Sequence, residues 1–178
     1  MEIKHRTELN KLMPKRKLIG AEVGVAEGLN ANDMLTNWNL KKLYLVDAWE
    51  CMPTHTGDAA SDQKWHDLNH KNVLRLMEMH KGKFKILRGL STAMAKNVID
   101  ESLDFVYIDC DHSYEGVMKD LQAWTPKVKK GGIIAGHDYL NLVYYVNKAV
   151  KDFTKGKYKA ITIPENKEED AGFYFIKK

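Results

Sequence analysis

The sequence predicts an α/β fold in which a doubly wound, mostly parallel sheet carries helices on both faces. Short apolar runs alternate with longer segments of helical periodicity, which is the usual pattern of βαβ units. Residues 103–109 are apolar along almost their whole length, as expected of a central strand buried on both faces. Two final apolar runs lie close enough together to pair as an antiparallel hairpin.

The individual elements follow in order along the chain. The predicted strands cover residues 18–25, 42–47, 84–87, 103–109, 133–136, 158–163 and 173–176. The predicted helices cover residues 31–38, 58–80, 91–98, 114–128 and 143–153. The second helix is supported by apolar residues at helical spacing, among which Trp65 and Met77 to Met79 are expected in the core. The fourth helix stops before Lys130-Gly131-Gly132. Five βα units and a hairpin predict a seven-stranded Rossmann-like sheet.

The length of 178 residues fits a single domain over residues 1–178. Residues 1–17 are expected to form a helical or extended N-terminal segment. The long connection at residues 50–63 is a candidate lid over a ligand, with an irregular surface loop as the alternative.

Composition narrows the classes of protein. No apolar run approaches the roughly 18 residues of a membrane span, and the basic N-terminus lacks the apolar core of a secretion signal. Cys51 and Cys110 form no metal or redox pattern, so we expect a cytoplasmic protein with free thiols. The formal charge is +4, but the lysines are spread along the chain, which disfavours a nucleic-acid substrate.

Polar residues end each of the five predicted parallel strands. Since ligands of open α/β sheets bind beyond the carboxyl ends of the strands, these residues are expected to surround one crevice. The segments concerned are Glu22 to Gly28, Asp47, Gly89 to Ser91, Asp109 to His112, and His137-Asp138.

The turn after the first strand indicates the class of ligand. Gly24 and Gly28 allow the backbone to approach a ligand, and Asp47 can accept both hydroxyls of a ribose. A dinucleotide fingerprint requires G-x-G-x-x-G, but the later positions hold Ala26 and Leu29. With Glu22 before the turn, the pattern favours a cationic sulfonium that carries an ammonium group. A tight turn without a ligand is the structural alternative.

These segments resemble class I S-adenosylmethionine (SAM)-dependent methyltransferases. The first motif is Glu22-x-Gly24-x-x-x-Gly28. The stretch from Leu103 to Tyr139 is similar to the macrocin-type branch of sugar and small-molecule O-methyltransferases. Its two motifs are Asp109-x-Asp111-His112-Ser113-Tyr114-Glu115-Gly116 and Gly131-Gly132-Ile133-Ile134-Ala135-Gly136-His137-Asp138. The resemblance covers roughly residues 18 to 140.

The resemblance implies a set of cofactor contacts. Glu22 and Gly24, with Gly28 closing the turn, would flank the methionine part of SAM, and Asp109 would also contact the cofactor. Asp47 would hold the ribose. Ala48 and Trp49 would lie beside the adenosine and Ser91 near the adenine, where Leu90 replaces an acidic residue common in the family.

Several members of this family bind Mg²⁺ at the ends of the fourth and fifth strands. The matching residues here are Asp109, His137 and Asp138. Since Mg²⁺ prefers oxygen ligands, the histidine leaves both a metal-dependent and a metal-independent enzyme open.

The resemblance implies methyl transfer to a hydroxyl of a small molecule, with a sugar or glycan expected as acceptor. A base that removes the hydroxyl proton would help, and the candidates are Asp111, His112 and His137. Structural roles are the alternatives: a helix N-cap for Asp111 and a carbonyl or cap contact for the histidines. Nitrogen or nucleic-acid acceptors and a noncatalytic SAM-binding partner module are the competing functions. Acceptor recognition could also involve a homo-oligomer, a partner subunit or a fused partner.

Overall fold

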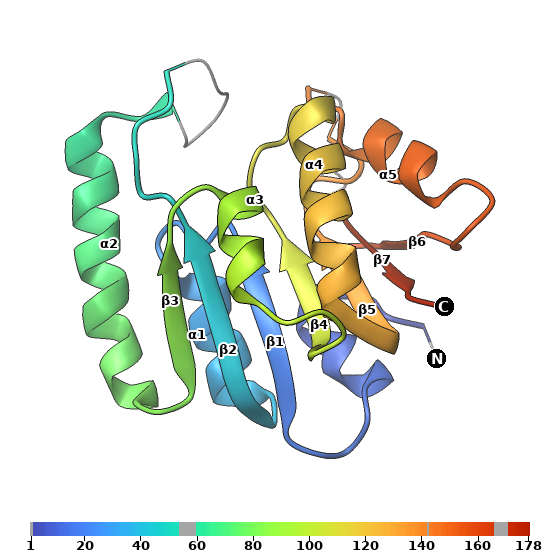
Figure 1. The fold of residues 1–178 in the computed structure, drawn as a ribbon, viewed down its shortest axis with the longest axis horizontal. Coiled ribbons are helices and arrows are strands. Elements are labelled where there is room, and N and C mark those ends of the chain that lie inside the picture. The colour runs from blue at the N-terminus through green and yellow to red at the C-terminus, as the bar shows by residue number, and fades with distance from the viewer. Residues whose placement is uncertain (1, 54–59, 142, 166–170) are drawn as a thin grey trace.

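The computed structural model describes residues 2–53, 60–141, 143–165 and 171–178, and Figure 1 shows a twisted sheet between helices. The seven strands lie in the order β3-β2-β1-β4-β5-β7-β6. They are β1 (Leu18–Val23), β2 (Leu40–Asp47), β3 (Phe84–Arg88), β4 (Leu103–Ile108), β5 (Val128–Gly136), β6 (Ile161–Ile163) and β7 (Gly172–Ile176). Neighbouring strands from β1 to β5 pair in parallel, whereas β7 is antiparallel to both β5 and β6. The predicted fold class is confirmed.

Helices cover both faces of the sheet, and each face has its own buried apolar cluster. The α-helices are α1 (Leu29–Asn37), α2 (Gln63–Met77), α3 (Ser91–Met94), α4 (Tyr114–Trp124) and α5 (Val146–Thr154), and the short 3₁₀ turns are η1 (Arg6–Leu12), η3 (Glu78–His80), η4 (Ala95–Asn97) and η5 (Thr125–Lys127). Buried residues of η1, α1 and α2 belong to one cluster, and those of α4 and α5 belong to the other. Figure 1 shows α3 and α4 in front of the sheet and α1 behind it.

Among the helix boundaries that differ from the prediction, two have a clear local cause. The helix expected over residues 58–80 begins at Gln63, since the Asp62 side chain accepts a hydrogen bond from the Trp65 amide at 2.8 Å. The helix expected over 114–128 ends as an α-helix at Trp124. Pro126 follows within η5, and its ring nitrogen has no hydrogen to continue the helix.

Two strand boundaries differ from the prediction by more than two residues. β5 begins at Val128 rather than residue 133, because residues between Val128 and Ile133 form a bulge, with Gly131 at a φ of +78°. β6 begins at Ile161 rather than residue 158, since the Tyr158 amide donates to the Thr154 carbonyl at 2.9 Å and prolongs the end of α5.

Within the N-terminal segment, the described residues 2–17 contain η1 and no other helix or strand. Leu9 is buried in the core on the α1 side of the sheet. The Arg6 amide and the His5 ring bind the Glu165 carboxylate, at 2.9 and 2.7 Å, which places this segment against the region between β6 and β7. No helix in the described ranges has the length and apolar character required to cross a membrane.

A buried carboxylate joins three segments at the amino end of β4. Asp104, only 4% exposed, accepts two hydrogen bonds from the Arg16 guanidinium at 3.0 and 2.6 Å. It also accepts from the Ile19 amide and the Lys129 ammonium, each at 2.8 Å. This cluster lies at the opposite end of β4 from the strand-end polar residues.

Replacing Asp104 with alanine is expected to lower the free energy of unfolding by about 2 kcal/mol at pH 7, as for other hydrogen bonds to charged groups. Burial alone would raise the pKa of Asp104, but the hydrogen bonds from Arg16, Lys129 and the Ile19 amide hold the pKa below its usual value of 3.8. The stabilisation is therefore complete above about pH 4 and is lost as the pH falls through the folded-state pKa. Urea unfolding at pH 7 and pH 3 measures this, with exposed Asp100→Ala as control. An equal effect of Asp104→Ala at both pH values would contradict the prediction.

Candidate active site

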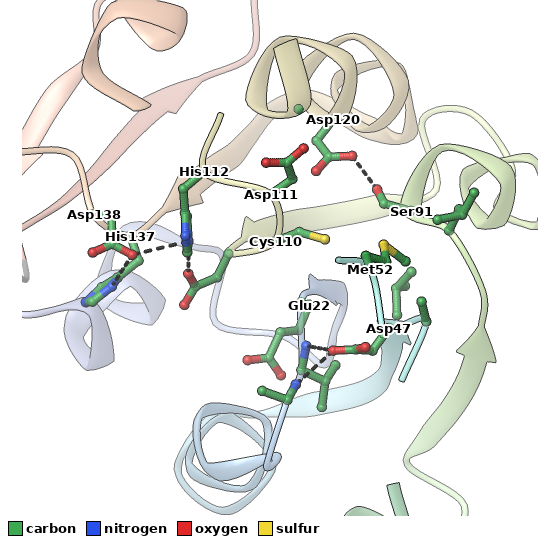
Figure 2. A pocket seen from close by; sticks show the side chains of 18 of the residues that line it. Glu22, Asp47, Met52, Ser91, Cys110, Asp111, His112, Asp120, His137 and Asp138 are labelled. Atoms are coloured by element: carbon green, nitrogen blue, oxygen red, sulfur yellow. Dashed lines mark hydrogen bonds and ion pairs between the residues drawn. The ribbon is translucent and has the colours of Figure 1, made fainter. Parts of the chain in front are cut away.

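A cavity of about 730 Å³ opens at the carboxyl ends of the parallel strands. It lies beside β1 and β4, where the strand order reverses, which is the usual ligand site of open α/β sheets. Its volume is in the range of small-molecule sites. The predicted site residues in its wall are Glu22, Gly24, Asp47, Ala48, Ser91, Asp109, Asp111, His112, His137 and Asp138. Figure 2 shows how several of these side chains surround it.

The turn after β1 requires glycine for two separate reasons. Gly24 has a φ of +88°, and a Cβ atom at this position would lie 1.8 Å from the Asp109 carbonyl oxygen. Gly28 has a φ of +80° and forms the N-cap of α1. Gly24 therefore allows the turn to pass directly against the end of β4, and Gly28 allows the chain to enter α1.

The Asp47 carboxylate holds this turn in place. Its Oδ2 accepts from the amides of Val25 and Ala26, both at 2.9 Å, and its Oδ1 accepts from the Trp49 amide at 2.7 Å (Figure 2 shows the first two). Ala26 and Trp49 have φ values of +45° and +44°, a strained conformation for residues with side chains. A carboxylate has about four acceptor positions, so Asp47 retains capacity for a ligand hydroxyl.

The Trp49 ring is not part of the cavity wall, and the contact of Trp49 with an adenosine stays a prediction. The side chain is 0% exposed, its Nε1 donates to the Ala26 carbonyl at 3.0 Å, and its ring packs on His70. The left-handed backbone turns the ring beneath the loop, and only its neighbour Ala48 lines the cavity.

Glu22 presents a buried carboxyl group to the cavity from β1. Its Oε1 accepts from the Asn30 amide group at 2.8 Å, whereas Oε2 has no hydrogen-bond partner among the described residues. Burial raises the pKa of Glu22 to about 8. An unpartnered buried carboxyl oxygen is costly unless a ligand supplies a donor or a cation.

Ser91 lies in a short chain of hydrogen bonds on the α4 side of the cavity. The Trp124 indole donates to Ser91 Oγ at 2.8 Å, and Ser91 Oγ donates to Asp120 Oδ1 at 2.5 Å. Asp120 lines the cavity but was not among the predicted site residues. An acidic residue on the otherwise apolar buried face of α4 is the sequence signal that could have identified it.

Two histidines and two aspartates meet at the ends of β4 and β5. His112 Nε2 lies 3.1 Å from Asp109 Oδ1 and 3.2 Å from Asp138 Oδ2, and His137 Nδ1 lies 3.3 Å from the same oxygen of Asp138 (Figure 2). His137 Nε2 is buried and has no partner in the described part of the chain. Tyr144 lines the cavity and stacks on His112 with 4.5 Å between ring centroids.

The charges within this cluster shift the pKa values of its two histidines and of Asp138. Burial alone would lower the pKa of each histidine, but contacts with Asp109 and Asp138 outweigh it and raise the pKa of both. Burial alone would raise the pKa of Asp138, but His137 and His112 lower it. The cluster therefore favours an ionised Asp138 beside protonated or hydrogen-bonded imidazoles.

Asp111 does not form the N-cap of α4, which was its structural alternative. Ser113 is the cap, with its Oγ accepting from the Gly116 amide at 3.0 Å. Asp111 Oδ1 accepts from the Ser113 amide at 2.9 Å, and its carboxyl group fills the space that a side chain at Gly116 would occupy. The Asp111 side chain thereby lines the cavity beside α4.

Asp109, His137 and Asp138 each offer one ligand atom, and these atoms lie within 4.8 Å of one another. The predicted metal residues therefore meet in space. Two carboxylates and an imidazole suit Mn²⁺ or Zn²⁺ better than Mg²⁺, which prefers an all-oxygen shell.

Further residues of the cavity wall were missed from the sequence. Trp65 was expected in the core but lines the cavity, whereas Met77 is fully buried and Met79 is 73% exposed.

The candidate lid at residues 50–63 lies partly outside the described residues, because 54–59 are not described, and the lid stays a prediction. Its two ends lie together, since the Cys51 amide donates to Gln63 Oε1 at 3.0 Å.

The sheet order and the cavity at its reversal are those of a Rossmann-like α/β fold. A family model described as a methyltransferase domain matches residues 21–139. The matched range is more than half of the chain and contains all of the predicted site residues. The chain therefore belongs to this methyltransferase family.

Solved structures share the fold. A methyltransferase candidate from Streptococcus mutans, in complex with SAH, is 13% identical, with a TM-score of 0.70 and 99% of each chain covered. An rRNA methylase from Streptococcus thermophilus is 12% identical, with a TM-score of 0.65 and 95% of this chain and 91% of that chain covered. At these identities the similarity concerns the fold alone.

An uncharacterised protein of Acanthamoeba polyphaga mimivirus is 26% identical over 152 residues. The alignment covers 81% of this chain and 64% of that relative, so the chain spans less than two thirds of the relative's length.

Proposed function

We propose that this chain binds SAM and transfers its methyl group to a hydroxyl of a polyhydroxylated small molecule such as a sugar. The observation that carries the cofactor assignment is Glu22, whose buried Oε2 lacks a partner at the end of β1. A carboxyl group here suits the ammonium and sulfonium groups of SAM and repels a diphosphate. Membership of a methyltransferase family supports the same donor.

The remaining parts of SAM have matching groups along the cavity. Asp47 would accept hydrogen bonds from the ribose hydroxyls, and Ala48 would lie beside the adenosine. Gly24, which passes directly against the end of β4, lies in the cavity wall where the methionine part of the cofactor would bind. The reactive methyl group would then face the cluster of Asp109, His112, His137 and Asp138.

The acceptor side has the chemistry of a polyol site. Asp109, Asp111 and Asp138 are hydrogen-bond acceptors for several hydroxyls, and the Tyr144 ring offers an apolar face for a sugar ring. The same carboxylates would repel the phosphates of a nucleic acid, which disfavours an RNA acceptor.

Methyl transfer would be an in-line displacement at carbon. An oxygen lone pair of the acceptor attacks the methyl carbon while the carbon–sulfur bond breaks, leaving neutral sulfur, and the hydroxyl proton passes to a base. His137 is suited to this role, since Asp138 can accept from its Nδ1 and leave Nε2 with a lone pair. His112 Nε2 is engaged by two carboxylates, so His112 would act as their counter-charge.

A divalent ion at Asp109, His137 and Asp138 is the second form of this proposal. The bound ion would lower the pKa of the acceptor hydroxyl, and His137 would then be a ligand instead of a base. Turnover before and after chelation separates the two forms.

Calorimetric titration with SAM, SAH and, separately, NAD tests the cofactor assignment. We expect SAM and SAH to bind and NAD not to bind. Polyhydroxylated acceptors are then incubated with SAM and analysed for a mass gain of one methylene group. Binding of NAD alone, or of no ligand, would contradict the cofactor assignment, and methylation confined to RNA would contradict the acceptor class.

Glu22 gives this titration a pH signature. Because the pKa of Glu22 is about 8 in the free protein, it is protonated below that pH, and pairing with the ammonium group of SAM would release its proton. We therefore expect proton release on binding and an affinity that rises between pH 6 and 7.5, by up to about tenfold per pH unit. Titrations in buffers of different ionisation enthalpy measure this. Glu22→Gln should remove both effects above about pH 7; their persistence there would assign the proton to another group.

A further inference from the structure

The end of the cavity beside α3 and α4 has an unusual distribution of polar groups. Leu90 and Ser91 come from the start of α3, and Asp120 comes from the buried face of α4. Leu90 is apolar and 56% exposed, so the connection after β3 offers no acidic side chain at this position. Figure 2 shows the Asp120 carboxyl group directed toward Ser91 at this end, across the cavity from Glu22.

The hydrogen bonds around Ser91 fix the role of each Asp120 oxygen. Ser91 has one hydroxyl proton, and its oxygen accepts from the Trp124 indole, which has only a donor. The Ser91 proton is therefore committed to Asp120 Oδ1. The other part of the carboxylate keeps acceptor capacity, and the residue lines the cavity.

Burying the Asp120 carboxylate costs free energy unless a ligand supplies a hydrogen-bond donor. Its side chain is 4% exposed and lies on the same buried face of α4 as Val117 and Leu121. Carboxylates are rarely this buried unless they are paired, and the hydrogen-bond partner of Asp120 among the described residues is the neutral Ser91. A donor from a bound ligand would offset the cost of burial.

We propose that Asp120 recognises the exocyclic amino group of the cofactor's adenine, so that α4 supplies the acidic contact that the connection after β3 lacks. This inference rests on the proposed binding of SAM. The adenine amine is a donor, whereas hypoxanthine presents a carbonyl oxygen at the same place. Asp120 therefore selects adenine by accepting a hydrogen bond and by repelling the carbonyl. Burial raises the pKa of Asp120 to about 6, so the group is mostly ionised at pH 7.5.

The test compares SAH with S-inosylhomocysteine, in which hypoxanthine replaces adenine, by calorimetry at pH 7.5. The wild-type protein should bind SAH at least about tenfold more tightly, as expected for a hydrogen bond to a charged group. In Asp120→Asn, the Ser91 hydroxyl must still donate to the side-chain oxygen, which directs the new amide donors toward the ligand. The variant should therefore bind SAH more weakly and S-inosylhomocysteine more tightly, reversing the preference.

Two variants control for indirect effects. Glu115→Gln makes the same acid-to-amide change elsewhere on α4 in the cavity wall, and it should keep the wild-type preference. Ser91→Ala keeps the Asp120 carboxylate and should keep a preference for SAH, although both ligands should bind it more weakly because Ser91 itself lines the cavity. Thermal unfolding of each variant verifies that it is folded.

The outcomes separate this inference from the proposed function. If the wild-type protein binds neither SAH nor SAM, the cofactor assignment itself fails. If it binds SAH but Asp120→Asn changes both affinities by the same factor, or neither, Asp120 has only a structural role and the inference is overturned. A selective change in the ratio of the two affinities supports direct contact with the base.

Discussion

Gly24→Ala is expected to weaken SAH binding by about 100-fold or more, which corresponds to about 2.7 kcal/mol. The added Cβ would lie 1.8 Å from the Asp109 carbonyl oxygen, so the turn after β1 and the end of β4 would have to separate. That movement would displace the amides held by Asp47 and disrupt the cavity where the methionine part of the cofactor is expected to bind. Calorimetry with SAH, together with urea unfolding, measures the effect.

Gly82→Ala is a matched control for this prediction. Gly82 has a φ of +83°, close to the +88° of Gly24, but a Cβ at Gly82 would have no neighbour within 4 Å. Both variants therefore introduce similar backbone strain, and only one introduces a clash. If Gly24→Ala binds SAH as well as Gly82→Ala does, the close approach of the turn to β4 is unimportant for binding.

His137→Gln is expected to lower kcat by about 10²-fold to 10⁴-fold, the usual effect of removing a general base. The affinity for SAH should change little, because the side chain lies on the acceptor side of the site. Turnover is measured with the acceptor that is methylated fastest in the screen. His112→Gln should have a smaller effect if His112 only balances the charges of Asp109 and Asp138.

Chelation distinguishes the two roles of His137. If His137 is the base, EDTA should leave the turnover of the wild-type protein unchanged. If the residue is a metal ligand, EDTA should abolish turnover, and Mn²⁺ or Zn²⁺ should restore it. Full turnover of His137→Gln in both conditions would exclude both roles.

The fold could be predicted because its signals are local and repeated. The apolar runs that became β1, β2 and β4 are separated by helix-length segments, and the hairpin follows from two short runs at the end of the chain. The errors were at the ends of helices and strands, where a single contact determines the residue at which an element begins or ends. The Asp62 cap, Pro126 and the bulge that contains Gly131 each moved an end by several residues.

The part of the site that follows the strands could also be predicted. Gly24, Asp47, Asp109 and His137 lie where parallel strands end, so sheet topology alone brings them together. Asp120 could not be assigned in this way, since it reaches the cavity through the packing of α4 against α3. The burial of the Trp49 ring beneath the loop could not be predicted either, because a left-handed φ at a tryptophan cannot be read from the sequence.

The turns after β1 and β2 are held in place by hydrogen bonds within the protein itself. Asp47 binds three of the neighbouring backbone amides, and these bonds hold Ala26 and Trp49 in conformations that cost free energy by themselves. The free-energy cost of fixing the backbone of these residues, about 1–2 kcal/mol per residue, therefore falls on folding. Ligand binding does not have to supply it again. Such preorganisation raises affinity without adding a contact. It also implies that the backbone of this loop is nearly the same in the free and ligand-bound states.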